Sequence, residues 1–291
     1  AASGGTREVL SDMTFDITAL LLPKGKAAAL QHIWDAYRAL RPGGRFYIAG
    51  ANAEGAKTYI RYAQDLFGPI AVRAYRKGCR VGVAARPMSS QPLPQRFQEP
   101  WLAHDYFQHY DVEVCNHPIH LLARPGVFAW DRLDAGTQAL LDAMRIGVGD
   151  RVLDLGCGCG VIGLAAAMLA PQGEVLMLDA DINAVVSARQ TVAANNIENA
   201  EVVLSDCSAV VENRDFDVVV TNPPFHQGKA TQYDVAYQFI RDAARLLKSG
   251  GRFYLVANRF LPYEDTIRQW LGQVDTIHED RRFKGLLGRK Q

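Results

Sequence analysis

The sequence predicts an α/β protein in which a parallel sheet is covered by helices on both faces. From about Arg151 onward, short apolar segments alternate with helical segments, as expected for buried parallel strands joined by crossover helices. An internal repeat extends this architecture toward the beginning of the chain. A glycine-rich loop directly follows the first of the apolar segments.

The apolar segments are expected as strands and the stretches between them as helices. The expected strands are RVLDLG (151–156), EVLMLDAD (174–181), AEVVLSD (200–206), FDVVVTN (216–222) and GRFYLVAN (251–258). VIGLAAAMLA (161–170) and INAVVSARQTVAANN (182–196) are expected as helices. Residues 105–124 alternate as in a β-hairpin, and we interpret His117 and His120 within it as ordinary surface histidines, with no metal site.

The internal repeat predicts that the chain begins with the back half of a second, similar domain. FDITALLLPKGK (15–26) matches FDVVVTNPPFHQGK (216–229), and PGGRFYIA (42–49) matches SGGRFYLV (249–256). The first copy has lost the polar loop residues, because Leu21 stands at the position of Asn222 and Lys24 at that of Phe225. We therefore expect a degenerate half domain at 1–86, a proline-rich linker at 87–104 and the active domain at 105–291.

Composition predicts a cytoplasmic globular protein. The chain has 32 basic and 31 acidic residues, a net charge of +1, which argues against a polybasic protein. Its 5 cysteines include no C-x-x-C pair and are interpreted as reduced thiols. No apolar run reaches the ~18 residues needed to span a bilayer, and the start AASGGTREVL lacks the apolar segment of a signal peptide.

The glycine-rich loop DLGCGCG predicts a nucleotide-like ligand. Gly156, Gly158 and Gly160 lie between a strand and a helix, where glycine allows a sharp turn and close approach to a ligand. The loop also satisfies the G-x-G-x-x-G pattern of dinucleotide enzymes. Asp154 favours another ligand, because a carboxylate beside the loop repels a pyrophosphate but attracts an ammonium group. S-adenosylmethionine carries such a group and no phosphate.

Two further carboxylates follow later strands and extend this interpretation. Asp179 ends the second strand, where an acidic side chain can accept hydrogen bonds from both ribose hydroxyls. Asp206 ends the third strand and is placed to accept the adenine amine, or alternatively to cap a turn. The sequence thus predicts S-adenosylmethionine as the cofactor.

The segment TNPPF (221–225) ends the fourth strand and predicts an acceptor site for an amine. Asn222 precedes proline, so its backbone is held extended, while Pro223 and Pro224 have no N–H to donate. The Asn222 side-chain oxygen and the Pro223 carbonyl can accept the two hydrogens of an exocyclic amine. Phe225 can stack on the attached ring. We expect Asn222 to lie beside the cofactor as well as the substrate.

These motifs resemble those of the class I amino-methyltransferases. Within that class, PGVFAWDRLDAGTQALL (125–141), NPPFHQG (222–228), LVANRFLPY (255–263) and RRFKGLLG (281–288) resemble the bacterial ribosomal RNA guanine-N2 methyltransferases of small-subunit type. The resemblance covers about 105–291. It implies a Rossmann-like domain with a seven-stranded, mostly parallel sheet, preceded by a degenerate copy of the same fold.

The resemblance also implies roles for the motif residues. Asn222, Pro223, Pro224 and Phe225 would hold the target guanine. The cofactor would be held by Asp154, Gly156, Gly158, Gly160, Asp179 and Asp206. Phe128 and the segment 134–137 would close over its methionine end. The family's first domain is normally complete, whereas here its first visible strand would be left as a bare edge.

The expected partner is ribosomal RNA or a ribosomal subunit, with the protein acting as a monomer. Residues 66–98 and 281–291 are locally basic and contain no acid, so they can contact phosphates or form solvated surface. A guanine in a helix must be unstacked to reach Asn222. Alternatives are methylation of a 23S guanine, an adenine N6 or a protein glutamine, a non-catalytic RNA-binding relative, and a nicotinamide-dependent oxidoreductase.

Overall fold

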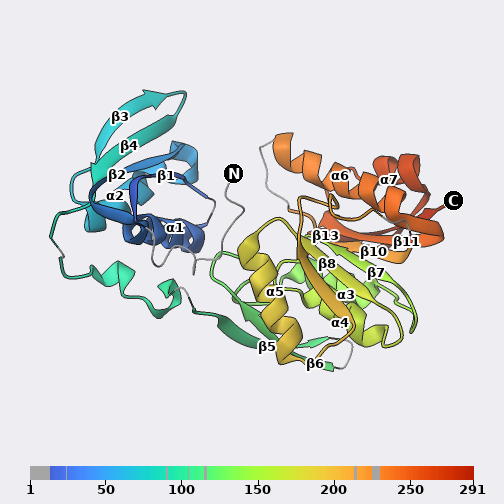
Figure 1. The fold of residues 1–291 in the computed structure, drawn as a ribbon. Helices are drawn as coiled ribbons and strands as arrows, with labels where there is room; N and C mark the ends of the chain where they lie inside the picture. Colours follow the sequence, from blue (N-terminus) through green and yellow to red (C-terminus); the bar gives the residue numbers. More distant parts are fainter. Residues whose placement is uncertain are drawn as a thin grey trace. The chain divides into compact units, whose positions relative to one another are not determined.

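The computed structural model describes residues 14–291, apart from 24, 90, 104, 115–116, 213–214 and 225–229. The chain divides into two compact units, Ala1–Phe107 and Gln108–Gln291. Each unit contains a sheet packed against helices (Figure 1). The boundary falls close to residue 105, where the sequence places the start of the active domain.

The first unit is built on a four-stranded sheet. Its elements are β1 (Phe15–Leu21), α1 (Lys26–Ala39), β2 (Leu40–Ala51), α2 (Ala56–Phe67), β3 (Ala71–Arg76) and β4 (Cys79–Ala85), with 3-10 helices at Asn52–Glu54, Gln95–Phe97 and Pro100–Leu102. The strand order is β1-β2-β4-β3, in which β1 and β2 are parallel and the other pairs antiparallel. Leu30, Ile33 and Phe67 of the two helices pack with Phe46 and Ile48 of β2 in one core.

The segment 87–104, expected as a linker, contributes side chains to this core. Phe97 and Leu102 are buried in it, and Gln31 Nε2 of α1 donates a hydrogen bond to the Leu102 carbonyl (3.4 Å). Single apolar residues within a proline-rich stretch have no periodicity. The sequence pattern therefore did not reveal their burial.

The second unit contains a β-hairpin and a seven-stranded sheet. The hairpin consists of β5 (Gln108–Val114) and β6 (His117–Ala123). The remaining elements are α3 (Ala135–Ala143), β7 (Val152–Leu155), α4 (Val161–Leu169), β8 (Val175–Asp179), α5 (Ile182–Ala194), β9 (Ala200–Leu204), β10 (Phe216–Thr221), α6 (Ala230–Leu246), β11 (Leu247–Asn258), α7 (Glu264–Leu271), β12 (Gly272–Glu279) and β13 (Phe283–Lys290).

The large sheet has the order β12-β13-β11-β10-β7-β8-β9. The strands from β11 to β9 are parallel, and β13 is inserted antiparallel between β12 and β11. Helices cover both faces (Figure 1). Successive residues of β10 show this, because Val218 and Val220 pack in the core with α3, α4 and α5, while Val219 packs in the core with α6 and α7. The predicted α/β class with a covered, mostly parallel sheet is confirmed.

The internal repeat is visible in the strand register. In the second unit β10 pairs with β11 through Val218↔Arg252, Val219↔Phe253 and Val220↔Tyr254. In the first unit β1 pairs with β2 through Ile17↔Arg45, Thr18↔Phe46 and Ala19↔Tyr47. The register shifts at matching positions, after Phe216 and after Phe15. The first unit is therefore a partial copy of the second, as the sequence predicts.

Strand β1 forms the edge of the first sheet among the described residues, where it pairs only with β2. Its equivalent, β10, pairs on its other side with β7 of the glycine-loop half of the domain. Ile17 and Leu21 on β1 are 56% and 79% exposed. The bare edge expected from the sequence is thus present in the described part of the chain.

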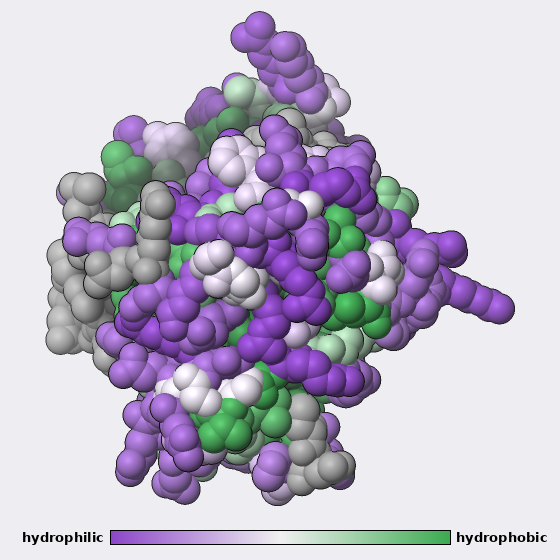
Figure 2. All heavy atoms as spheres, turned by 90° about the vertical axis from the view of Figure 1, so that its right-hand side faces the viewer, coloured by the Kyte–Doolittle hydropathy of each residue, from purple (hydrophilic) through white to green (hydrophobic). Residues whose placement is uncertain are grey.

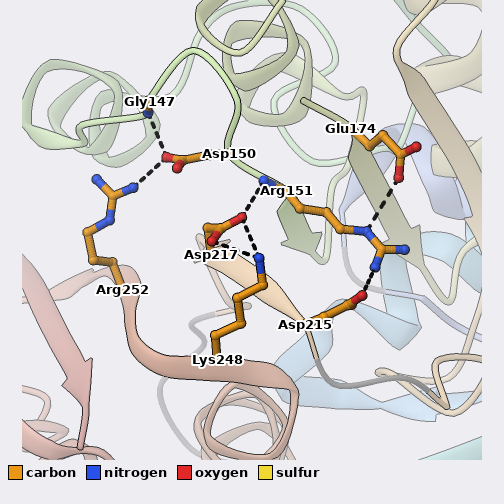
Figure 3. Close-up of polar contacts among 8 residues, drawn as sticks. All are labelled: Gly147, Asp150, Arg151, Glu174, Asp215, Asp217, Lys248 and Arg252. Carbon is orange, nitrogen blue, oxygen red and sulfur yellow. Dashed lines mark hydrogen bonds and ion pairs between the residues drawn. The ribbon is translucent and has the colours of Figure 1, made fainter. Parts of the chain in front are cut away.

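A network of charged residues joins the amino-terminal ends of the central strands in the second unit (Figure 3). The Arg151 N–H, just before β7, donates to Asp217 Oδ2 of β10 (2.9 Å), and Lys248 Nζ of β11 donates to Asp217 Oδ1 (3.0 Å). Arg151 also pairs with Asp215, and its Nε lies 3.4 Å from Glu174 Oε2. Burial acts to raise the pKa of Asp217, but the hydrogen bonds from Arg151 and Lys248 outweigh it and hold that pKa below its usual range.

On the face drawn in Figure 2, most of the surface is hydrophilic and the hydrophobic residues lie in separate patches. Among the described residues, we find no helix that combines the length and the apolar character needed to cross a membrane.

Candidate active site

A cavity of about 420 Å³ opens at the carboxyl-terminal edge of the large sheet. The residues that follow four strands form its floor: Gly156–Cys159 after β7, Asp179–Asp181 at β8, Ser205–Cys207 after β9 and Asn222–Pro224 after β10. Its other wall is formed by Tyr110, Val127–Ala129, Leu133 and Thr137, with Val235 and Phe239 of α6. The carboxyl edge is where open α/β sheets bind their ligands, and the volume suits a cofactor-sized molecule.

The glycine loop is shaped by left-handed backbone. Gly156, Gly158 and Gly160 have φ angles of 76°, 57° and 91°, which other residues adopt only with strain. The Gly156 N–H donates to the Leu178 carbonyl (2.8 Å), which draws the loop toward the end of β8. A Cβ on Gly158 would meet only a carbonyl oxygen at 3.9 Å, so this residue leaves space in the cavity. Gly160 is the N-cap residue of α4 and is not part of the cavity wall.

Asp179 and Asp206, predicted to hold the cofactor, both line the cavity. Asp179 Oδ2 accepts the Gly158 N–H (2.9 Å) and its Oδ1 accepts the Asp181 N–H (2.8 Å). Burial raises the pKa of Asp179, against the effect of these hydrogen bonds. Asp206 is exposed. The structure therefore brings together a fixed carboxylate at β8 and an accessible one after β9.

Asp154, predicted to bind a ligand ammonium, is not among the residues that line the cavity. It belongs to β7 itself and is 0% exposed. Its Oδ2 accepts the Gly163 N–H of α4 (2.9 Å), and its Oδ1 has no hydrogen-bond partner among the described residues. Burial raises the pKa of Asp154 to about 7. In this structure the residue holds α4 against β7 from beneath the loop.

The segment after β10 presents an oriented amide. The Thr221 hydroxyl donates to the Leu155 carbonyl (2.7 Å) and ties the end of β10 to β7. Asn222 Nδ2 donates to Thr137 Oγ1 (2.8 Å) and to Asp134 Oδ2 (3.3 Å). Asn222 Oδ1 is buried and has no partner among the described residues. A residue of the cavity wall thus carries an acceptor that no described group satisfies.

The prolines of this segment lie on the cavity wall next to the amide. Pro223 is buried and Pro224 is exposed. Phe225, predicted to stack on the acceptor ring, lies outside the described residues. Phe128, predicted to close over the ligand, is on the wall and 56% exposed.

Several wall residues had not been identified from the sequence. Tyr110 of the hairpin donates its hydroxyl to the Ala129 carbonyl (2.7 Å), and burial raises its pKa. Phe239 lines the cavity from α6. Ala129 and Cys207, also on the wall, have positive φ angles of 56° and 49°, a strain typical of functional sites. Of these residues, only Phe239 could have been identified from the sequence, because it lies on the apolar face of the amphipathic helix α6. Backbone strain and the contacts of a hairpin leave no periodic pattern in the sequence.

The residues of the cavity fit S-adenosylmethionine. Asp179 has carboxylate oxygens that could also accept from a ribose diol, the Gly158 backbone leaves room in the cavity, and Asn222 carries an unpartnered oxygen. The sheet order and the cavity define a class I S-adenosylmethionine-dependent methyltransferase. The predicted fold and cofactor are confirmed by the comparisons that follow.

The sequence model of the methyltransferase small domain family matches residues 118–286. The chain is 36% identical over 275 residues to ribosomal RNA small subunit methyltransferase C of Hahella chejuensis, covering 94% of this chain and 77% of that protein. It is 34% identical over 262 residues to the Escherichia coli protein of that name, covering 90% and 72%. The chain belongs to the ribosomal RNA small subunit methyltransferase C family.

A solved structure supports the same assignment. It is described as the T. thermophilus 16S rRNA N2 G1207 methyltransferase (RsmC) in complex with AdoMet and guanosine. The two structures align with a TM-score of 0.83 at 31% sequence identity, covering 96% of this chain and 74% of the other. The similarity therefore extends over both units of the chain.

Proposed function

We propose that the protein transfers a methyl group from S-adenosylmethionine to the exocyclic N2 amine of a guanine in small-subunit ribosomal RNA. The observation that carries the proposal is the Asn222 amide, whose nitrogen is engaged by two side chains while its buried oxygen has no partner. A guanine N2 amine has hydrogens to donate to that oxygen. The T. thermophilus relative in complex with AdoMet and guanosine supports this choice of acceptor.

The chain's own residues would hold the two reactants in place. Asp179 and the Gly156–Gly158 backbone would hold the cofactor, which when bound supplies an electrophilic methyl group. Asn222 Oδ1 and the Pro223 carbonyl would accept the amine hydrogens and direct the nitrogen lone pair. Holding the groups in line lowers the entropic part of the barrier. No strong base is needed, because the methylated amine is cationic and loses its proton readily.

The aromatic wall gives the acceptor ring a place to bind. Phe128, which is 56% exposed, and Phe239 both line the cavity, so a planar base has apolar surfaces to contact. A guanine within a duplex must be unstacked to enter. A flipped or single-stranded guanine is therefore the proposed substrate state.

The first unit is proposed to contact the RNA backbone. All six residues of β3 are exposed, and Tyr75 at 62% exposure lies under the Arg80 guanidinium, 5.0 Å from its ring centroid. The β3–β4 hairpin also carries Arg73, Arg76 and Lys77 and has no acidic residue. Cations beside an exposed ring are suited to phosphates and unpaired bases.

The cavity is built from the second unit alone, so a second copy of the chain is not required to complete it. We therefore propose that the protein works as a monomer. A ribosomal RNA substrate supports our proposal that the protein acts in the cytoplasm.

The test is methyl transfer from labelled S-adenosylmethionine to unmodified small-subunit RNA, offered as naked RNA and as assembled subunits. Label on a single guanine N2 is expected, and mapping the nucleotide identifies it. Label on an adenine, on 23S RNA or on protein would contradict the proposal.

Asn222→Ala should lower kcat by ~10²-fold or more while calorimetry shows cofactor binding unchanged, since one oriented acceptor of this kind supplies about that much. Asp179→Ala is the matched contrast and should weaken cofactor binding first. Wild-type turnover in Asn222→Ala would remove the basis of the assignment.

A further inference from the structure

The Asn222 side chain is held at its nitrogen end only. Nδ2 donates to Thr137 Oγ1 at 2.8 Å and to Asp134 Oδ2 at 3.3 Å, whereas Oδ1 has no partner among the described residues. An amide can rotate by 180° and exchange these two ends with little change in shape. The function proposed for Asn222 needs the oxygen, not the nitrogen, to face the acceptor amine.

Asp134 decides between the two orientations. A carboxylate only accepts hydrogen bonds, so it can face the NH₂ end of the amide but not its oxygen. The Thr137 hydroxyl both donates and accepts, and it would tolerate either end. The contact with Asp134 is therefore the one that selects the observed orientation, and the Thr137 contact reinforces it.

The Asp134 carboxylate is itself fixed in place. It is the N-cap residue of α3, and the same Oδ2 accepts the Thr137 N–H at 2.9 Å. The turn is tightly packed, because a Cβ on Gly136 would lie 3.0 Å from Asp134 Oδ2 and 3.2 Å from the Phe283 ring. A side chain held by the helix end and by this packing can orient its neighbour without moving.

The unpartnered oxygen explains why such a selector is needed. Without Asp134, rotation of the amide would let Asn222 Oδ1 accept a hydrogen bond from the Thr137 hydroxyl and would turn Nδ2 toward the cavity. The Thr137 hydroxyl serves both orientations, so without Asp134 none of the described hydrogen bonds of Asn222 would select the one with its oxygen unbound. A rotated amide would present donors to an amine that also needs to donate.

We propose that Asp134 and Thr137 are positioning residues that set the amide orientation of Asn222, so that its oxygen receives the acceptor amine. The proposal rests on the function assigned to Asn222 above. It assigns to the first turn of α3 a role in catalysis that is exerted through Asn222.

A double-mutant cycle tests this. Asp134→Ser keeps an oxygen for the helix cap but is too short to reach Asn222. In the full chain it should lower kcat by about 10-fold or more, with the cofactor Kd from calorimetry unchanged within about 3-fold. In the Asn222→Ala background the same change should alter kcat by less than about 2-fold, because its effect passes through the missing amide. An undiminished effect in that background overturns the proposal.

A second pair of variants covers the case in which Asp134→Ser impairs folding. Asn222→Asp places two carboxylates together and should be inactive. Adding Asp134→Asn should restore kcat by about 10-fold or more, because the new amide at position 134 can donate a hydrogen bond to the carboxylate at position 222. Absence of rescue overturns the proposal. Thr137→Ser should retain activity and Thr137→Val should lose about 3-fold or more; equal activity of the two contradicts the role of Thr137.

The kcat of every variant is measured on the amine that the wild-type protein methylates. The orientation argument applies to any exocyclic amine acceptor. A wild-type acceptor other than guanine would therefore count against the proposed function alone, and the mutant cycle would still judge this inference.

Discussion

Replacing Asp154 by Asn should stabilise the protein at neutral and alkaline pH. Asp154 is completely buried, and its Oδ2 accepts the Gly163 N–H. An asparagine carbonyl can keep that hydrogen bond while removing an ionisable group from the interior. The variant should therefore gain stability wherever the unfolded wild-type chain has an ionised Asp154.

The magnitude follows from the pKa of this carboxyl. Burial raises the pKa of Asp154 from 3.8 to about 7. Between these values the folded protein holds a proton that the unfolded chain has released, so the free energy of unfolding falls as the pH rises. At about 1.36 kcal/mol per pKa unit the full effect is roughly 4 kcal/mol, of which roughly 3 kcal/mol develops between about pH 4.5 and 8.

The assay is thermal unfolding of wild type and Asp154→Asn by calorimetry across this pH range. Comparing the two proteins at each pH cancels the other titrating groups, so the difference in unfolding free energy should widen in favour of the variant as the pH rises. Asp265→Asn, whose side chain is 90% exposed, serves as a control and should show no widening. A constant difference between wild type and Asp154→Asn would refute the reasoning.

Two further predictions concern packing and RNA binding. Gly163→Ala should lower the free energy of unfolding by about 1–3 kcal/mol, because its Cβ would lie 2.4 Å from Met177 Sδ. Gly149→Ala, whose Cβ would have no atom within 4 Å, is the control. Equal melting temperatures of the two variants would contradict the packing argument. Arg76→Ala combined with Lys77→Ala should reduce the slope of the logarithm of the ribosomal RNA binding constant against the logarithm of salt concentration by about 1.5, since each phosphate contact contributes about 0.7–0.9. An unchanged slope would show that the RNA does not bind at the β3–β4 hairpin.

Sequence pattern was sufficient for the strands that are buried on both faces. The apolar run before Asn222 became β10, and the repeat placed Leu21 at the equivalent point of β1, with matching register in both units. The site edge also followed from sequence, because the carboxyl ends of parallel strands share one edge. Asp179, Asp206 and Asn222 accordingly line one cavity.

Features that depend on side-chain direction or distant contacts were not predictable. Asp154 lies within β7 and points beneath α4, and the choice between that direction and the cavity depends on the register of a short strand. The contact between Asn222 and Thr137 joins residues 85 positions apart. Phe97 and Leu102 had no periodic neighbours to signal their burial. Such contacts arise from packing of the whole domain, which local periodicity does not record.

The charged network around Arg151 and Asp217 lies at the amino ends of the strands whose carboxyl ends carry the cavity (Figure 3). The described residues of this charged network do not line the cavity. The ion pairs at the amino-terminal edge of the sheet can therefore be redesigned without substituting any residue that lines the cavity.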